Sequence, residues 1–245
     1  MTIRSPYLAE TLLDSGADPR TAGNAGPTDG RAPASRRWAL AGLGAGVTGA
    51  AAVLATGFVT PVYDAELDAD ATRINQALGD FVPQMAAFHV LGTISAVLMI
   101  VFAAGLHRRL RASAPADSIA PTVAAWGLLG TAFVLILGTG LDTEFLFAAG
   151  TDMVVPEAAT FYNHWIGTIP WCWGLLGLSG VALFPLSRTG AVARWLGLVG
   201  LLGGGLTLLL GISPLQYMAG MTGPIGLIVV ALGFLVGDKA FRNAA

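Results

Sequence analysis

The sequence predicts an all-α integral membrane protein, built as a bundle of six transmembrane helices with a duplicated helical hairpin. Composition is the first observation behind this prediction: of 245 residues, 54% are hydrophobic and only 11% are charged, with a mean hydropathy of +0.68. Soluble domains carry about 25% charged residues, so this chain has too few to cover a water-facing surface. The other two observations are a series of long apolar runs and the separation of basic from acidic residues along the chain.

The composition also excludes several functional classes. The net charge of −2 argues against a nucleic-acid partner. The only cysteine, Cys172, lies in an apolar run, so the sequence has neither a disulfide framework nor a CxxC metal site. The only lysine, Lys239, follows the last apolar run, which excludes a retinal Schiff base within the membrane. The 3 histidines are too few for the axial ligands of a two-haem bundle.

Two domains are expected. Residues 1–35 are rich in Pro, Gly, Asp, Ser and Thr and are predicted to form a disordered cytoplasmic tail, while residues 36–245 form the transmembrane domain. Arg36 and Arg37 precede the first apolar run in a way that is similar to a twin-arginine export signal. That run, about 21 residues, is longer than a typical signal core. The two arginines are therefore interpreted as holding the cytoplasmic end of a first membrane helix.

Six apolar runs have the length of about 20 residues that crosses a hydrocarbon core of ~30 Å. The expected helices cover residues 38–58, 86–106, 121–141, 165–186, 191–212 and 217–236. The first carries Gly42, Gly46 and Gly49 at the small-residue spacing that suits close helix packing.

An acidic segment, residues 62–85, separates the first two runs. Its alternating carboxylates resemble the start of a calcium-binding EF-hand loop, but Ala69 stands where that loop needs Gly and Asn75 where it needs Glu. A solvated acidic loop with a short helix is the preferred interpretation.

Charge then predicts orientation. With the N-terminus inside, the cytoplasmic ends hold nearly all basic residues: Arg36, Arg37, Arg108, Arg109, Arg111, Arg188, Arg194, Lys239 and Arg242. The outward segments hold Arg73 and most of the carboxylates. The positive-inside rule therefore predicts a cell-membrane protein with both termini in the cytoplasm.

A short motif occurs twice. His89-Val90-Leu91-Gly92-Thr93-Ile94 recurs as His164-Trp165-Ile166-Gly167-Thr168-Ile169, and each copy is followed by a basic turn and then a tryptophan, Trp126 or Trp195. This order predicts that the second and third helices are a duplicate of the fourth and fifth. Such hairpins pack about a pseudo-twofold axis, which would bring the two histidines towards each other.

Four ionisable residues are candidates for a functional site at the outer ends of these helices: His89, His164, Asp142 and Glu144. Gly and Thr follow each histidine at i+3 and i+4, so each imidazole shares a small-residue, packed face. Imidazole and carboxylate ligands suit zinc, iron or manganese, although no compact ligand motif is present and no cofactor is assigned. The alternatives are that both carboxylates cap the third helix in outside water and that the histidines are ordinary interfacial residues.

The segment around the second motif adds ligand-binding candidates. Tyr162 and Asn163 precede His164 and can supply hydrogen bonds to an outward-facing ligand. Trp171 and Trp173 follow Pro170, which can kink a helix, so this stretch could line an aromatic cavity.

Three functions stay open at this stage. The first is binding of a small lipophilic or ionic ligand at the outward-facing site, for transport, sensing or an accessory role. The second is a membrane-embedded acid/base enzyme, of the isomerase or cyclase type, with Asp142 or Glu144 as the general acid for a lipophilic substrate. The third is a structural subunit whose glycine-rich faces pack against a second copy or another membrane partner.

Overall fold

The computed structural model describes residues 36–237, and every regular element in that range is helical. The predicted all-α class is confirmed. The predicted tail, residues 1–35, and the basic residues Lys239 and Arg242 lie outside the described residues.

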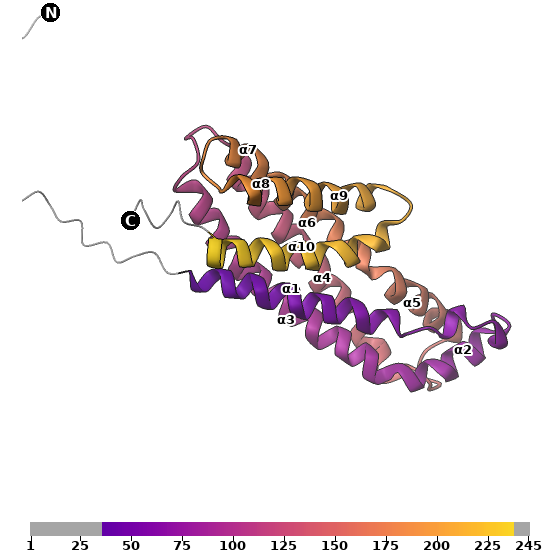
Figure 1. The fold of residues 1–245 in the computed structure, drawn as a ribbon. Helices are drawn as coiled ribbons and strands as arrows, with labels where there is room; N and C mark the ends of the chain where they lie inside the picture. The colour runs from indigo at the N-terminus through magenta and orange to yellow at the C-terminus, as the bar shows by residue number, and fades with distance from the viewer. Residues whose placement is uncertain (1–35, 238–245) are drawn as a thin grey trace, which may run out of the picture. The chain divides into compact units, whose positions relative to one another are not determined.

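The described residues form both long helices and short helical segments (Figure 1). The α-helices are α1 (Arg37–Gly57), α2 (Ala71–Leu78), α3 (Val82–Arg111), α4 (Ala120–Ala148), α5 (Pro156–Thr168), α6 (Leu176–Val181), α7 (Leu183–Arg188), α8 (Arg194–Val199), α9 (Gly205–Ile212) and α10 (Ala219–Leu232). The 3₁₀ segments are Pro61–Tyr63, Ala65–Leu67, Gly79–Phe81, Ile169–Leu175 and Gln216–Met218, and the π-helical segments are Gly200–Gly204 and Gly233–Gly237.

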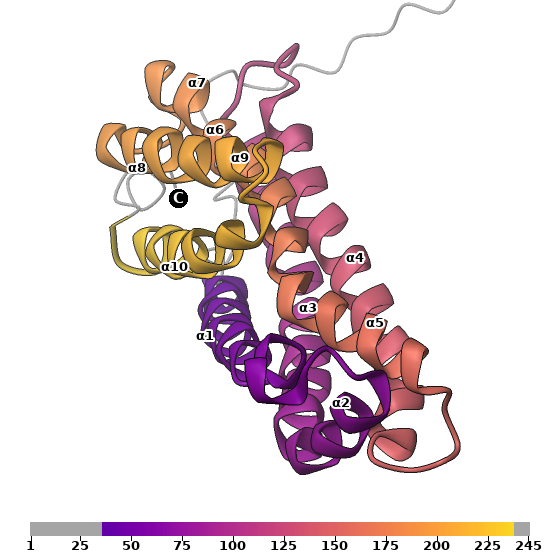
Figure 2. The same cartoon turned by 90° about the vertical axis from the view of Figure 1, so that its right-hand side faces the viewer.

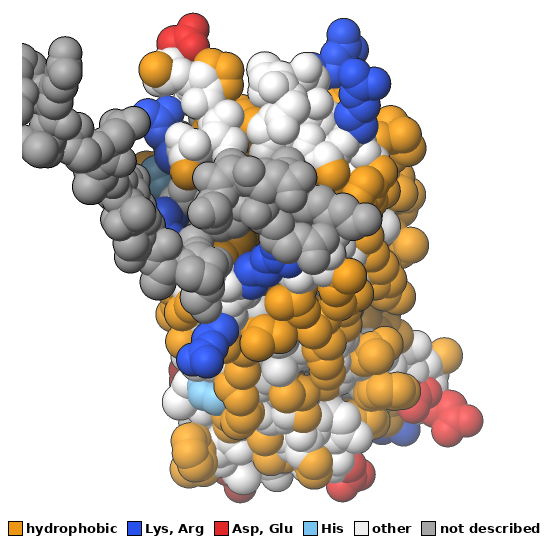
Figure 3. Space-filling view, turned by 60° about the vertical axis from the view of Figure 1, so that its left-hand side comes forward, with side chains coloured by type: hydrophobic (Ala, Val, Ile, Leu, Met, Phe, Trp, Pro, Cys, Tyr) orange, Lys and Arg blue, Asp and Glu red, His pale blue; other side chains and the backbone are white. Residues whose placement is uncertain are grey.

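Within residues 36–237 these elements join into 6 helical stretches that are long and apolar enough to cross a membrane. They are Arg37–Gly57, Ala71–Arg111, Ala120–Ala148, Pro156–Arg188, Arg194–Ile212 and Gln216–Gly237. The chain is therefore a multi-pass membrane protein whose helices contact a lipid bilayer. Hydrophobic side chains cover the flank of the bundle, as Figure 3 shows for one face.

Glycines set the distance between the first helices. An added Cβ at Gly42 would lie 2.4 Å from the ring of Phe102 on α3, and one at Gly49 would lie 2.4 Å from the ring of Trp173. Aromatic rings thus fill the spaces that these glycines leave, which is the close packing expected of membrane helices. Figure 1 shows α1 lying alongside α3 on one side and α10 on the other.

A second glycine contact joins α6 to the fifth stretch. An added Cβ at Gly177 would lie 2.5 Å from the carbonyl oxygen of Gly204, and one at Gly200 would lie 2.5 Å from that of Gly180. Here backbone faces backbone, so no side chain can be accommodated without separating the helices. In Figure 2 α6, α8 and α9 lie together, on the far side of α10 from α1.

Several helices are longer than their apolar runs predicted. α3 begins at Val82 rather than at residue 86, and α4 continues to Ala148 rather than ending at residue 141. Hydropathy reports the thickness of the hydrocarbon layer, whereas a helix continues while its backbone hydrogen bonds do. As a result Asp142 lies within α4, and the expectation that it caps a helix end in outside water is wrong.

The segment before α3 contains the expected short helix, α2. The side chain of Asp70 accepts a hydrogen bond from the backbone N–H of Arg73, which is the usual N-cap arrangement. The buried amide of Asn75 donates to the carbonyl of Thr151 and accepts from the N–H of Gly150, so it joins α2 to the loop between α4 and α5. This part of the chain therefore forms a packed end to the bundle.

The duplication stays a prediction. α3 is continuous through its His89 motif, whereas the His164 motif runs directly into the 3₁₀ segment Ile169–Leu175. Trp126 and Trp195 are both exposed on the bundle surface, at 69% and 46%. The two copies thus share their outward-facing tryptophans but differ in local helix geometry.

Candidate functional site

The candidate site centres on Asp142, which is fully buried although it is a carboxylate. Two small-residue contacts let its neighbours approach α4. An added Cβ at Gly92 on α3 would lie 2.9 Å from the methyl group of Thr139, and one at Gly138 would lie 3.2 Å from Ile169. With bulky residues at these positions α3 and the fourth stretch would be held away from the carboxylate. Gly92 and Gly138 therefore allow the neighbouring helices to enclose the carboxylate of Asp142.

Three helices supply the polar groups of the cluster that we call the Asp142 cluster: His89 on α3, Asp142 on α4 and Tyr162 on α5. The phenol of Tyr162 donates a hydrogen bond to Oδ1 of Asp142. Nδ1 of His89 lies 3.5 Å from Oδ2 of the same carboxylate. Tyr162 is 2% exposed, whereas the His89 side chain is 31% exposed. The imidazole is therefore the member of the cluster that reaches the surface of the described structure.

The hydrogen bonding of this cluster is incomplete on one side. Oδ2 of Asp142 and Nδ1 of His89 are both buried atoms that have no hydrogen-bond partner among the described residues. Polar atoms in such positions are normally satisfied, and a buried charge without a partner costs several kcal/mol. One proton shared between the two atoms removes this cost, either as an imidazolium beside a carboxylate or as a carboxylic acid facing a neutral imidazole. The geometry therefore suits a group that holds a proton.

Aromatic packing fixes the phenol. The ring of Phe145 stacks on that of Tyr162 with centroids 4.1 Å apart and an interplanar angle of 9°, and Trp165 lies 6.4 Å from Tyr162. Phe145 follows Asp142 by three residues, so it lies on the same face of α4. The hydroxyl is thereby held towards the carboxylate.

One helical turn further along, a pair of hydroxyls continues the polar contact between α3 and α4. Thr93 donates to Thr139 at 3.2 Å, and Thr139 donates to the carbonyl of Ile136 at 3.1 Å. His89, Gly92 and Thr93 thus all face α4, as their spacing predicts. This face is the part of the first motif that packs.

The second motif has a different environment. His164 is exposed and lies against the ring of Tyr63, with centroids 5.7 Å apart in an edge-to-face arrangement. Glu144 is also exposed, two residues beyond Asp142. The structure therefore brings together His89 and Asp142 of the four ionisable candidates, and it turns His164 and Glu144 outwards.

The remaining candidates on the fourth stretch have structural contacts. Asn163 is fully buried; its amide donates to the carbonyl of Val59 at 2.9 Å and accepts from the N–H of Val62 at 2.9 Å. Both ends of the amide are thus occupied by the backbone that follows α1. Trp173 is 1% exposed and packs against glycines, whereas Trp171 is 37% exposed.

Trp173 does line a cavity, but its volume is only about 10 Å³. The expected aromatic cavity for a lipophilic molecule is therefore filled by packed side chains at this position. A larger hollow, of about 380 Å³, opens near the end of α1 and is lined by hydroxyl-bearing residues that include Thr60, Tyr63, Thr168 and Tyr217. It lies beside Tyr63, against which His164 packs.

Within residues 36–237, no group of three or more His, Cys, Asp or Glu side chains is close enough to hold a metal ion. The site residues that the sequence interpretation missed are Phe145 and Thr139. Their signal was present, because Phe145 and Thr139 lie three residues on either side of Asp142.

No protein-family model, curated protein or solved structure matches this chain.

Proposed function

We propose that this multi-pass membrane protein binds a proton, and a small ligand or cation that competes with it, at the Asp142 cluster. One observation carries the proposal: within residues 36–237, the fully buried Oδ2 of Asp142 accepts no hydrogen bond and lies 3.5 Å from Nδ1 of His89, which has no hydrogen-bond partner there either. Ionisable groups inside a membrane bundle are expensive to keep and are usually functional.

The charge balance explains why a proton and a cation compete. With one proton, the pair of Asp142 and His89 is neutral overall. Without it, a negative charge is buried against apolar helices, and a small cation or a hydrogen-bond donor can restore the balance. The titratable groups that face Asp142 are His89 from α3 and Tyr162 from α5. Because Tyr162 already donates to Oδ1, the ligand would be received at Oδ2.

Access to the cluster supports an outward-facing route. His89 is the partly exposed member of the cluster. The segment between α1 and α3 carries carboxylates that attract cations: Asp64, Glu66, Asp68 and Asp80. We place this end outside a cell membrane and both termini in the cytoplasm, on the distribution of basic residues. Transport, sensing and an accessory role all remain compatible with such a site.

A membrane-embedded enzyme is the weaker candidate. Asp142, hydrogen-bonded to a phenol, resembles a general acid in its chemistry, but a lipophilic substrate needs room beside it. Asp142 lines neither the cavity of about 10 Å³ next to Trp173 nor the hollow of about 380 Å³ beside Tyr63, and only the hollow has the ~300–1,000 Å³ of a ligand pocket. A purely structural subunit would instead use the Asp142 cluster only to join three helices.

A pH titration of the purified protein distinguishes these functions. Trp165, whose ring lies 6.4 Å from that of Tyr162, provides a fluorescence signal near the cluster. Raising the pH removes the shared proton, so the wild-type emission should change in one step. Asp142→Asn should abolish that step, whereas Glu144→Gln, an exposed carboxylate on the same helix, should retain it. Identical titration curves for the wild type and Asp142→Asn would overturn the proposal.

Addition of a cation tests the second part of the proposal, that a cation competes with the proton at the Asp142 cluster. Sodium or an organic ammonium ion, added at a pH where the proton has been lost, should restore the low-pH emission in the wild type but not in Asp142→Asn. If neither cation acts while the proton step persists, the site binds protons alone.

A further inference from the structure

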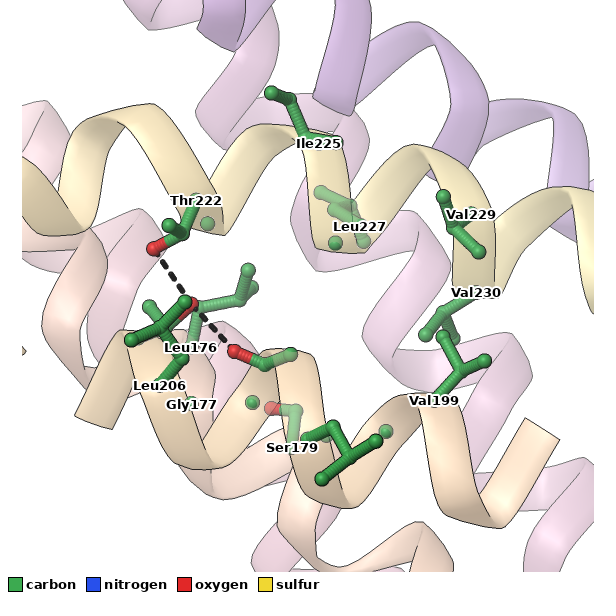
Figure 4. Close-up of a pocket in the computed structure, with 18 of the residues that line it drawn as sticks. Leu176, Gly177, Ser179, Val199, Leu206, Thr222, Ile225, Leu227, Val229 and Val230 are labelled. Atoms are coloured by element: carbon green, nitrogen blue, oxygen red, sulfur yellow. Dashed lines mark hydrogen bonds between the residues drawn. The ribbon is translucent and has the colours of Figure 1, made fainter. Parts of the chain in front are cut away.

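Another cavity lies between α9 and α10, away from the Asp142 cluster, and has a volume of about 380 Å³. Its walls come from α3, α4, α6, the fifth stretch without Gly205, and α10, and they include Phe102, Gly203, Leu206, Met221 and Gly226. Figure 4 shows Thr222 at one end of this cavity and Val199 and Val229 at the other. The residues at its rim, including Leu202, Leu206 and Ile225, are exposed, so the cavity opens on the flank of the bundle.

The described walls of the cavity offer an occupant neither a charge nor a free polar group. Among residues 36–237, no charged side chain lines the cavity. Its hydroxyl groups are already bonded within the chain: Ser179 donates to the carbonyl of Ala124 at 2.6 Å, and Thr207 donates to Thr222 at 2.8 Å. The occupant therefore needs no charge and no strong hydrogen-bonding group.

Two glycines in the walls have no packing role. An added Cβ at Gly203 or at Gly226 would have no atom of the described residues within 4 Å. Glycine within a helix is less stable than alanine, and close packing, which explains Gly177 and Gly204, does not explain these two positions. What their missing side chains provide is space in the cavity.

The π-helical segment Gly200–Gly204 forms part of the same wall. π-helical turns are rare and occur frequently at functional sites. The cavity thus combines an irregular backbone, unoccupied glycine positions and a volume within the ~300–1,000 Å³ of small-molecule pockets.

We infer that this cavity, the α9–α10 pocket, binds the hydrocarbon chain of a lipid from within the bilayer. An α-helix with its side chains is about 10–12 Å across, so a partner helix could insert only side chains, and not its backbone, into a 380 Å³ space. A water-soluble ligand would meet neither a charge nor an unbonded polar group. The pocket lies in the middle of two membrane-spanning stretches, Arg194–Ile212 and Gln216–Gly237, where hydrocarbon is the surrounding solvent.

Photocrosslinking in vesicles tests this inference. The full-length protein is placed in phosphatidylcholine vesicles that contain a phosphatidylcholine with a diazirine on one acyl chain, and adducts are mapped by mass spectrometry. Peptides with Leu206 and Met221 should be labelled, and this labelling should saturate as the labelled lipid is increased. Peptides with Val47 and Leu54, exposed residues of α1, should be labelled in simple proportion to it.

Filling the pocket provides the decisive comparison. Gly203→Leu and Gly226→Leu should remove the saturable labelling, because their side chains occupy the space. Gly205→Leu is the matched control: it lies on the same stretch and also has open space at its Cβ, but it does not line the pocket. It should label like the wild type, and so should Asp142→Asn, since the inference is independent of the Asp142 cluster.

Two results would overturn the inference. One is labelling of Leu206 and Met221 in the wild type that never saturates. This measurement does not depend on the folding of any variant. The other is saturable labelling that persists in folded Gly203→Leu and Gly226→Leu proteins.

Discussion

The hydroxyl of Tyr162 donates a hydrogen bond to the buried carboxylate of Asp142, and this contact ties α5 to α4 at the end of the bundle that carries most of the carboxylates. Tyr162→Phe should therefore destabilise the protein by about 1–3 kcal/mol, because Oδ1 of Asp142 loses its donor without gaining water. The stacking on Phe145 is retained by the substituted ring. Unfolding in mixed micelles measures the effect, and Tyr63→Phe, at an exposed tyrosine, should leave the stability near that of the wild type.

A second prediction concerns the amide of Asn163, which joins α5 to the segment after α1. Asn163→Leu leaves the carbonyl of Val59 and the N–H of Val62 unpaired, which should cost about 1–3 kcal/mol for each group. Asn163→Asp keeps the acceptor for Val62 but loses the donor to Val59, and its charge adds a burial cost. Both variants should thus lower the thermal midpoint. Equal stability of Asn163→Leu and the wild type would show that the Asn163 amide does not stabilise the contact between α5 and the segment after α1.

Glycines in the bundle should divide into two groups on substitution by alanine. Gly177→Ala places its Cβ 2.5 Å from a backbone carbonyl and should destabilise by about 1–3 kcal/mol, because two helices must separate. Gly140→Ala meets open space and should be neutral or stabilising by up to about 1 kcal/mol. Thermal unfolding of the two variants in the same micelles gives the comparison, and equal destabilisation by both would show that contact distance does not govern these positions.

Topology can be tested with cysteines in intact cells. Met153→Cys, at a residue 71% exposed between α4 and α5, should react with an impermeant thiol reagent, whereas Ala112→Cys, after α3, should not. Gly150 is a poor choice for this purpose, because its φ of +76° and its closeness to Gly79 strain any side chain. The native Cys172 is buried and should contribute no signal. Labelling of position 112 would reverse the proposed orientation.

Much of the fold was predictable because membrane helices must satisfy their own backbone and span a fixed thickness. All six stretches were located from hydropathy alone. Their ends were not, because α4 continues for seven residues beyond its predicted end at residue 141 and so encloses Asp142. The length of an apolar run predicts how much of a helix lies in the hydrocarbon layer. It does not predict how far the helix continues beyond that layer.

The site was only half predictable, and helix geometry gives the reason. Tyr162 and His164 were both expected at one ligand site, yet residues two apart on an α-helix point about 200° away from each other. Once Tyr162 faces Asp142, His164 must face outwards, where it meets Tyr63. Which of the two side chains faces inwards depends on the rotation of α5 about its own axis when it packs against α4. The sequence of α5 alone does not determine this rotation.

The 3₁₀ segment Ile169–Leu175 changes the direction of every side chain beyond it. A 3₁₀ turn advances about 120° per residue against about 100° for an α-helix, so seven residues shift the angular register by roughly 140°. The stretch Pro156–Arg188 can therefore present one side to α4 through Tyr162 and another to Gly204 through Gly177. A helical wheel drawn through this stretch as one α-helix would assign lipid-facing positions to the wrong residues. Scanning mutagenesis of it should be read with two wheels, one ending at Thr168 and the other starting at Leu176.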